Sequence, residues 1–257
     1  MIAVSSELQV VLSTGFWHAA MIFLRVGALV SLLPAFGDRS VPSRVKLGLA
    51  IAFSAVVAPA VPTIPAPSDL LGLGGVAVSE VGIGLALGIG IRLFVLILQT
   101  AGSMAAQATS LSHLLGGAGV DPAPAMGFVL VVGGLALAMM AGLHVRAAMF
   151  LIASYDLFPF ANIPGGRAIS GWGVTQISQG FSLAFLMAAP FLIASTVYNL
   201  TLGVINRAMP QLMVAFVGAP VITLGGLFLL FVCAPVMLSV WADALHFFLQ
   251  NPLGRTR

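Results

Sequence analysis

The chain of 257 residues is 60% hydrophobic and only 7% charged, and its mean hydropathy of +1.13 lies outside the range of soluble domains. A soluble fold with this composition would expose enough apolar surface to aggregate, so the composition favours a membrane protein. The formal charge of +3 comes from few residues and forms no basic patch interleaved with aromatic residues, so it does not indicate nucleic-acid binding. Cys233 is the single cysteine, which excludes an internal disulfide.

Apolar segments of membrane length are predicted along the whole chain, since a spanning helix needs about 20 residues. In chain order they lie at about 10–36, 45–66, 71–98, 125–153, 174–205 and 212–249. No basic residue precedes the first segment, so we expect uncleaved hydrophobic segments in place of a cleaved signal peptide. Prolines and glycines mark the breaks, and the alternating pattern of a membrane β-barrel is absent. The sequence predicts an all-α membrane-type fold of bent helical hairpins.

Charged residues interrupt several of these apolar segments. The intramembrane charges that we single out are Arg25, Glu80 and Arg92, because charges in such segments face protein or water and not lipid. Glu80 and Arg92 are separated by about 18 Å along a straight helix, so they cannot pair directly. Gly82, Gly84, Gly88 and Gly90 give a spacing of small residues that suits close contact between helices.

Catalytic and metal-binding patterns are missing from the sequence. It contains no G-x-S-x-G, no H-E-x-x-H and no phosphate-binding glycine loop. The four histidines, His18, His113, His144 and His246, show no ligand spacing and are interpreted as structural or interfacial residues. We expect neither an enzyme nor a bound cofactor or metal.

A long connecting region stands apart in the middle of the chain. From Gln99 to Met126 the composition is small, polar and rich in glycine, and long loops are usually functional or disordered. Leucines within it would be unfavourable in water, and the glycines after them allow the segment to fold back. We therefore predict a plug-like loop at 107–121, with a solvated connector as the alternative. The plug residues are Ser110, Leu111, Leu114, Leu115, Gly116, Gly117 and Gly119.

A polar elbow separates the last two apolar segments. Asn206, Arg207, Pro210 and Gln211 lie there in the run NRAMPQ, and such groups are unfavourable against hydrocarbon. We predict the tip of a helical hairpin, with Arg207 and Asn206 bonded to backbone carbonyls or to neighbouring subunits. A simple turn between helices is the alternative.

Two other classes of membrane protein fit part of this pattern. A small-solute secondary transporter has broken helices and intramembrane charges, but its breaks recur in two repeated halves, and the elbow has no clear counterpart in the first half. A purely structural scaffold would explain the packing features but not the glycine-hinged apolar loop.

Several short motifs follow one another along the chain in a characteristic order and spacing. They are Leu24–Gly27, Leu33–Gly37, Val41-Pro42, Arg44, Gly84–Gly88, Arg92, Asp121-Pro122, Ala188–Pro190, Asn199, Gly203, Asn206–Gln211 and Gly218–Pro220. Together they resemble one family, the FliR proteins of the flagellar export gate, whose SpaR-type and SctT-type homologues serve virulence injectisomes. The resemblance covers most of the chain and is most specific at the elbow. Met213 and Ala215 depart from the family pattern, which has a small polar and an aromatic residue there.

The resemblance implies a subunit of the inner-membrane export gate within the flagellar basal body of a bacterium. It implies assembly with FliP-type and FliQ-type subunits into a channel for unfolded flagellar proteins, with FlhB-type and FlhA-type proteins as further partners. Residues 1–173 would form a FliP-like helical region and residues 174–257 a FliQ-like hairpin. The resemblance implies no cofactor and no nucleic acid, and it is nearer to the flagellar than to the injectisome branch.

Overall fold

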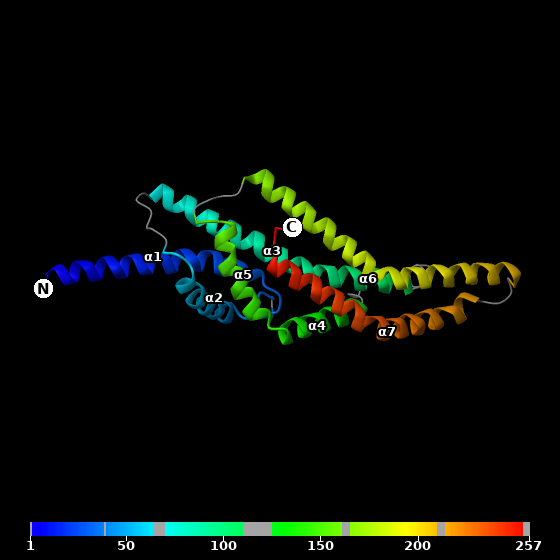
Figure 1. Ribbon diagram of the computed structural model, residues 1–257. Helices are drawn as coiled ribbons and strands as arrows, with labels where there is room; N and C mark the ends of the chain where they lie inside the picture. The colour runs from blue at the N-terminus through cyan, green and yellow to red at the C-terminus, as the bar shows by residue number, and fades with distance from the viewer. Residues whose placement is uncertain are drawn as a thin grey trace. The chain divides into compact units, whose positions relative to one another are not determined.

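The computed structural model describes residues 2–38, 40–63, 70–109, 125–160, 165–209 and 214–253, and these ranges contain helices and no strand (Figure 1). In chain order the elements are α1 (Ile2–Leu32), α2 (Ser43–Val57), the 3-10 helix η1 (Ala58–Ala60), α3 (Leu70–Thr109), α4 (Ala125–Met140), α5 (Leu143–Leu157), α6 (Gly166–Ala208) and α7 (Val214–Gln250). The predicted all-α fold is confirmed.

Five of these helices are long and apolar enough to cross a membrane, and the bent pair of α4 and α5 brings the number to six. The predicted segment 125–153 is wrong as a single helix, because α4 and α5 meet at a break with a bend of 72°. Gly142 lies in this break with a φ of 77°, a left-handed conformation that glycine adopts without steric penalty.

The third helix is longer than predicted. It continues through residues 99–109, which the sequence had indicated as part of a connecting region, and ends at Thr109. Alanine, glutamine and methionine are good helix formers, so the polar composition of this stretch does not end the helix. The second helix is shorter than predicted, since Pro59 and Pro62 follow its end at Val57.

The described chain divides into two compact units that share their longest helices. Unit 1 comprises Met1–Arg92, Met139–Thr175 and His246–Arg257, and unit 2 comprises Leu93–Ala138 and Gln176–Leu245. This division follows contacts within the chain. The predicted division into FliP-like and FliQ-like parts at residue 173 concerns likeness to other proteins and stays a prediction.

Glycines allow helices α1 and α3 of unit 1 to approach closely. A Cβ atom on Gly84 would clash with the carbonyl oxygen of Arg25, and a Cβ on Gly88 would lie 3.0 Å from the Cβ of Leu32. The predicted small-residue contact is therefore present at these two positions. Gly82 has open space around it and takes no part. The close approach brings α3 against the part of α1 that carries Arg25.

Unit 2 has its own close contacts. Trp241 of α7 is buried, and its indole Nε1 donates a hydrogen bond of 2.8 Å to the carbonyl oxygen of Phe94 on α3. Gly102 of α3 lies directly against the backbone of Gly127 on α4. Near the connection between α6 and α7, the Tyr198 hydroxyl donates to the carbonyl oxygen of Gly218 over 2.8 Å, which holds these neighbouring helices together (Figure 1).

The contact between Gly102 and Gly127 generates a prediction about stability. Gly102→Leu should destabilise the protein by about 1–3 kcal/mol or more, because a side chain has no space against the facing backbone. Gly225→Leu on α7 is the matched control, since nothing lies within 4 Å of a Cβ at that position. The melting temperature of each detergent-solubilised variant checks the prediction, and an equal shift for both variants would contradict it.

Candidate functional site

Three helices of unit 1 meet at a buried ion pair. Arg25 of α1 and Glu80 of α3 are both 0% exposed, and Ser154 and Tyr155 of α5 are buried beside them. The guanidinium group faces the carboxylate in the two-pronged geometry that arginine and carboxylates favour. Arg25 Nε donates to Glu80 Oε2 over 2.8 Å, and Arg25 Nη2 donates to Glu80 Oε1 over 3.0 Å.

Every N–H group of the Arg25 side chain has an acceptor. In addition to the bonds to Glu80, Nη1 donates to the carbonyl oxygen and to the hydroxyl oxygen of Ser154, each over 3.2 Å, and Nη2 donates to the carbonyl oxygen of Phe158 over 3.0 Å. A guanidinium group has five N–H donors, and these contacts use all of them. Complete hydrogen bonding is what makes a buried charge tolerable.

Arg25 also caps the end of helix α5. The last carbonyl groups of a helix lack partners within the helix and carry a partial negative charge. Helix α5 ends at Leu157, and Arg25 binds the carbonyl groups of Ser154 in its last turn and of Phe158 just after it. The Ser154 carbonyl also accepts from the Phe158 backbone N–H over 2.9 Å, so Arg25 adds a cation to an end that is already closed by a backbone bond. The guanidinium carbon lies 3.8 Å from the centre of the Tyr155 ring, which adds a cation–π interaction.

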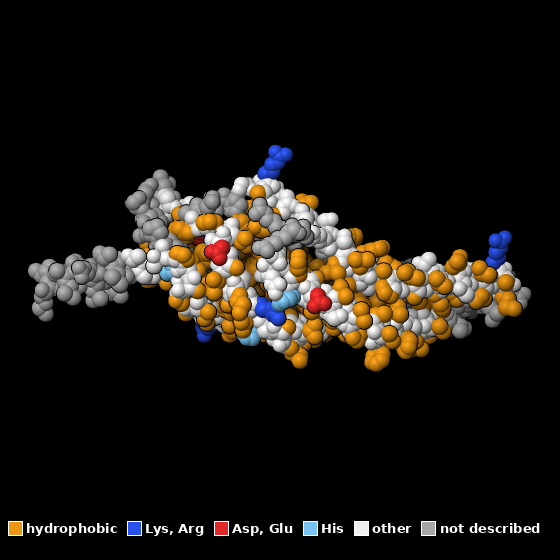
Figure 2. Space-filling model, in the orientation of Figure 1, with side chains coloured by type: hydrophobic (Ala, Val, Ile, Leu, Met, Phe, Trp, Pro, Cys, Tyr) orange, Lys and Arg blue, Asp and Glu red, His pale blue; other side chains and the backbone are white. Residues whose placement is uncertain are grey.

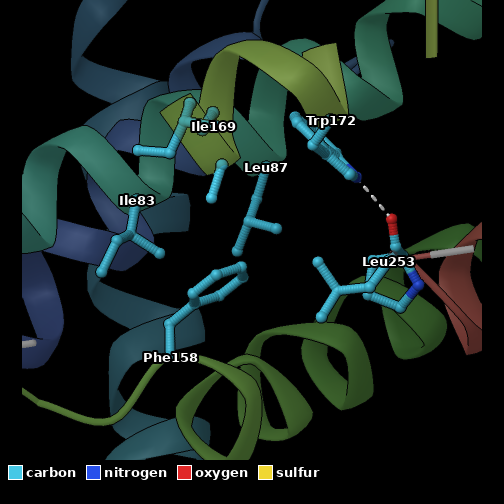
Figure 3. Close-up of a pocket in the computed structure, with 9 residues that line it drawn as sticks. Ile83, Leu87, Phe158, Ile169, Trp172 and Leu253 are labelled. Atoms are coloured by element: carbon cyan, nitrogen blue, oxygen red, sulfur yellow. Dashed lines mark hydrogen bonds between the residues drawn. The ribbon is translucent and has the colours of Figure 1, made fainter. Parts of the chain in front are cut away.

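An apolar pocket adjoins the ion pair through Phe158. The carbonyl oxygen of Phe158 accepts from Arg25, while its ring points into a pocket of about 80 Å³ together with Ile83, Leu87 and Ile169 (Figure 3). The pocket is therefore fixed on one side by the same backbone that binds the buried cation.

The C-terminal end of the described chain closes the other side of this pocket. Trp172 of α6 donates a hydrogen bond of 2.7 Å from its indole nitrogen to the carbonyl oxygen of Pro252, and Leu253 lines the pocket next to it (Figure 3). The Trp172 ring also packs near Phe248 of α7, with ring centres 6.5 Å apart. Aromatic contacts of this kind hold the ends of α6 and α7 together within unit 1.

The structure brings together only part of the predicted site. Arg25 and Glu80 form the ion pair, but their pairing was not predicted, because they are 55 residues apart in the sequence. Arg92 is exposed on α3 and does not join the cluster. Asn206 and Arg207 are exposed at the end of α6, with Arg207 in its last turn.

The remaining predicted residues lie outside the described part of the chain. These are Pro210 and Gln211 of the elbow and the plug residues Ser110, Leu111, Leu114, Leu115, Gly116, Gly117 and Gly119. Within the described ranges, no group of three or more histidine, cysteine, aspartate or glutamate residues is placed to hold a metal ion.

Sequence reasoning missed the contribution of α5 to the cluster. Ser154 and Phe158 bind Arg25 partly through their backbone carbonyls, for which the sequence carries no signal. The Tyr155 ring lies under the guanidinium group, whereas the neighbouring Asp156 is exposed. An arginine and a glutamate in separate apolar segments were the available indication of a pair.

The chain matches known proteins along most of its length. The family described as bacterial export proteins, family 1, matches residues 16–247. Three similar proteins are each named flagellar biosynthetic protein FliR. The protein from Caulobacter vibrioides is 35% identical, covering 88% of this chain and 91% of the relative. The Escherichia coli K12 protein is 30% identical, covering 86% and 84%. The Bacillus subtilis protein is 25% identical, covering 86% and 87%.

Long apolar helices joined by a buried, fully bonded ion pair define an all-α membrane protein. The chain belongs to the family of bacterial export proteins that includes the FliR flagellar biosynthetic proteins. It is therefore a membrane-embedded subunit of the flagellar export apparatus, and the resemblance seen in its sequence motifs is confirmed.

The buried pair generates a prediction about single and double substitutions. Arg25→Met or Glu80→Leu alone should cost about 3–5 kcal/mol, because each leaves the other charge buried without its partner. The double variant should be less destabilised than the sum of the two, because it removes both charges together. The melting temperatures of the solubilised proteins check this.

Tyr155→Phe is the matched control for the cluster. It keeps the ring under Arg25 and removes only a buried hydroxyl group for which the described residues offer no hydrogen-bond partner. We expect no loss of stability from it. Strictly additive effects of Arg25→Met and Glu80→Leu would contradict the interaction between the two charges.

Proposed function

We propose that this chain is a subunit of the inner-membrane export gate of the flagellar system. It assembles with FliP-type and FliQ-type subunits into the channel through which unfolded flagellar proteins are exported. The observation that carries the proposal is the large apolar surface that α6 and α7 leave uncovered. In the apolar, membrane-length part of each helix, only 28% of α6 and 22% of α7 are buried within the chain.

The exposed side chains of α6 and α7 include many large apolar ones, and Figure 2 displays much of this surface in orange. Surfaces of this kind require either lipid or another protein. Examples are Phe181, Phe185 and Leu200 of α6 and Phe228 and Phe231 of α7.

Polar groups among these apolar side chains favour a protein partner over lipid. Asn199 is exposed in the middle of the apolar surface of α6, directly before Leu200, and a polar side chain there gains a hydrogen bond from a neighbouring helix but none from lipid. Pro190, Pro220 and Pro235 interrupt the backbone bonding of the same two helices, and groups freed in this way are satisfied by neighbouring helices.

In this proposal the two parts of the chain resemble two different kinds of gate subunit. Residues 1–173 pack as a FliP-like element and residues 174–257 as a FliQ-like hairpin, so that one chain occupies positions next to both kinds of subunit. FlhB-type and FlhA-type proteins then adjoin the gate in the bacterial inner membrane, within the flagellar basal body.

The loop at 107–121 is proposed as a plug of the channel. Its leucines would fill a narrow lumen and exclude water, which blocks ions at a hydrophobic constriction. The glycines that follow would let the loop move aside for an exported chain. This part of the proposal depends on the sequence alone, because residues 110–119 lie outside the described ranges.

Co-isolation tests the assembly. An affinity-tagged chain extracted from membranes in mild detergent should bring FliP-type and FliQ-type subunits with it. Arg207→Ala should lower their recovery severalfold, because Arg207 is exposed at the end of α6 and its removal leaves acceptors on a neighbour unpaired. Arg167→Ala, at the exposed start of the same helix, is the control. A tagged wild-type chain that brings neither subunit would contradict the proposal.

Deletion of residues 110–119 tests the plug. The deletion should leave the complex assembled while making the membrane leaky to small ions, measured as loss of membrane potential in cells or as conductance of the purified complex. A replacement of the same ten residues by a glycine–serine sequence of equal length separates the apolar character from the length. Ion tightness equal to the wild type in both variants would leave the loop as a connector.

A further inference from the structure

A second cation in unit 1 lies in an open hollow between α5 and α7. The hollow has a volume of about 410 Å³, and we call it the α5–α7 hollow. Its lining includes Val145, Arg146 and Met149 of α5 and His246, Leu249 and Gln250 of α7. None of them takes part in the cluster around Arg25.

Hydrogen bonds hold the Arg146 side chain in a fixed position. Its Nε donates to the carbonyl oxygen of Ala141 over 3.0 Å, and its Nη1 lies 3.0 Å from Nε2 of His246. A guanidinium group can only donate, so Nε2 of His246 accepts, and the ring carries its proton on Nδ1. The amide nitrogen of Gln250 lies 2.8 Å from the same Nε2. His246 is thus a neutral partner that orients Arg146 without balancing its charge.

Arg146 forms no ion pair with a carboxylate of the described residues. The described residues hold one ion pair, between Arg25 and Glu80. The hydrogen bonds of Arg146 leave its Nη2 without an acceptor among these residues. The Nδ1 of His246 is buried without a partner in the described ranges, so a group from outside the chain does not reach it. A half-buried guanidinium group with an unused N–H donor favours an acceptor that comes from outside the chain.

The surroundings of Arg146 indicate which acceptor fits. Val145 and Met149 are one helical turn apart on α5 and are exposed by 47% and 63%. They form an apolar rim beside a single guanidinium group, and the hollow contains no lysine or second arginine. A phosphate group usually collects several cationic or backbone donors, whereas one planar guanidinium suits one carboxylate. Apolar neighbours of that carboxylate would cover the rim.

We infer that the α5–α7 hollow receives an apolar helix of a neighbouring export-gate subunit, and that an aspartate or glutamate of this helix pairs with Arg146. This inference rests on the proposed function and names the chemistry of one contact in that assembly. His246 then acts as a positioning residue, because it holds the guanidinium group toward the incoming carboxylate.

Photo-cross-linking in the assembled complex tests the inference. A benzoylphenylalanine at position 149 of the otherwise unchanged tagged chain should cross-link to an apolar helix of another subunit, within one turn of an aspartate or glutamate. Mass spectrometry of the cross-linked peptide identifies that carboxylate. This measurement does not depend on the folding of any charge variant.

Charge reversal completes the test. Arg146→Glu should lower both the cross-link and the recovery of the complex by about tenfold or more, because like charges that face each other at an interface are strongly unfavourable. Replacing the identified carboxylate by lysine should restore recovery with Arg146→Glu. Arg167→Glu is the matched control, since Arg167 is exposed on α6 and outside the hollow, and it should have no effect.

Three results would overturn the inference: a cross-link to phospholipid, a cross-link to a protein segment without a carboxylate nearby, or full recovery of the complex with Arg146→Glu. Failure of the wild-type chain to bring down FliP-type and FliQ-type subunits is a different result. It would overturn the proposed function, while a cross-link to a carboxylate-bearing helix of some other subunit would still identify the partner of Arg146.

Discussion

A permanent cation at a position with no access to water must have all of its hydrogen bonds made by protein, and Arg25 is in this situation. Its five N–H donors bind Glu80 of α3, Ser154 of α5 and Phe158, which directly follows α5. Movement of either helix away from α1 would leave a buried charge or a donor without a partner, which is strongly unfavourable. The arrangement of α1, α3 and α5 in unit 1 depends on this constraint.

Other features of unit 1 follow from the position of these helices. Gly84 allows α3 to lie against the backbone of Arg25, which brings Glu80 within reach of the guanidinium group. Phe158 accepts from Arg25 and also lines the apolar pocket that Trp172 and Leu253 close. In unit 2 the helices are held by other contacts. Gly102 of α3 lies against Gly127 of α4, and Trp241 of α7 donates a hydrogen bond to Phe94 of α3. The exposed apolar sides of α6 and α7 remain for contact with other molecules.

The sequence predicted the helices well because membrane-length apolar segments are its strongest signal. It did not predict the bend at Gly142, since an isolated glycine in an apolar run has many possible roles. The end of α3 at Thr109 was missed because a small and polar composition was interpreted as a loop, although its residues form helices readily. The sequence singled out Arg25 and Glu80 as charges within apolar segments, and both are buried in the structure. Their pairing depends on how two helices cross, which hydropathy does not contain.

The most direct test of this account is a cryo-electron-microscopy map of the chain in its assembled complex, at a resolution that separates side-chain atoms. In this map Arg25 and Glu80 should pair with each other within one chain, with the carbonyl groups of Ser154 and Phe158 as the remaining acceptors. This pairing would be contradicted by a map in which either side chain turns to a neighbouring subunit or to the lumen, because the constraint on α1, α3 and α5 would then lie outside the chain.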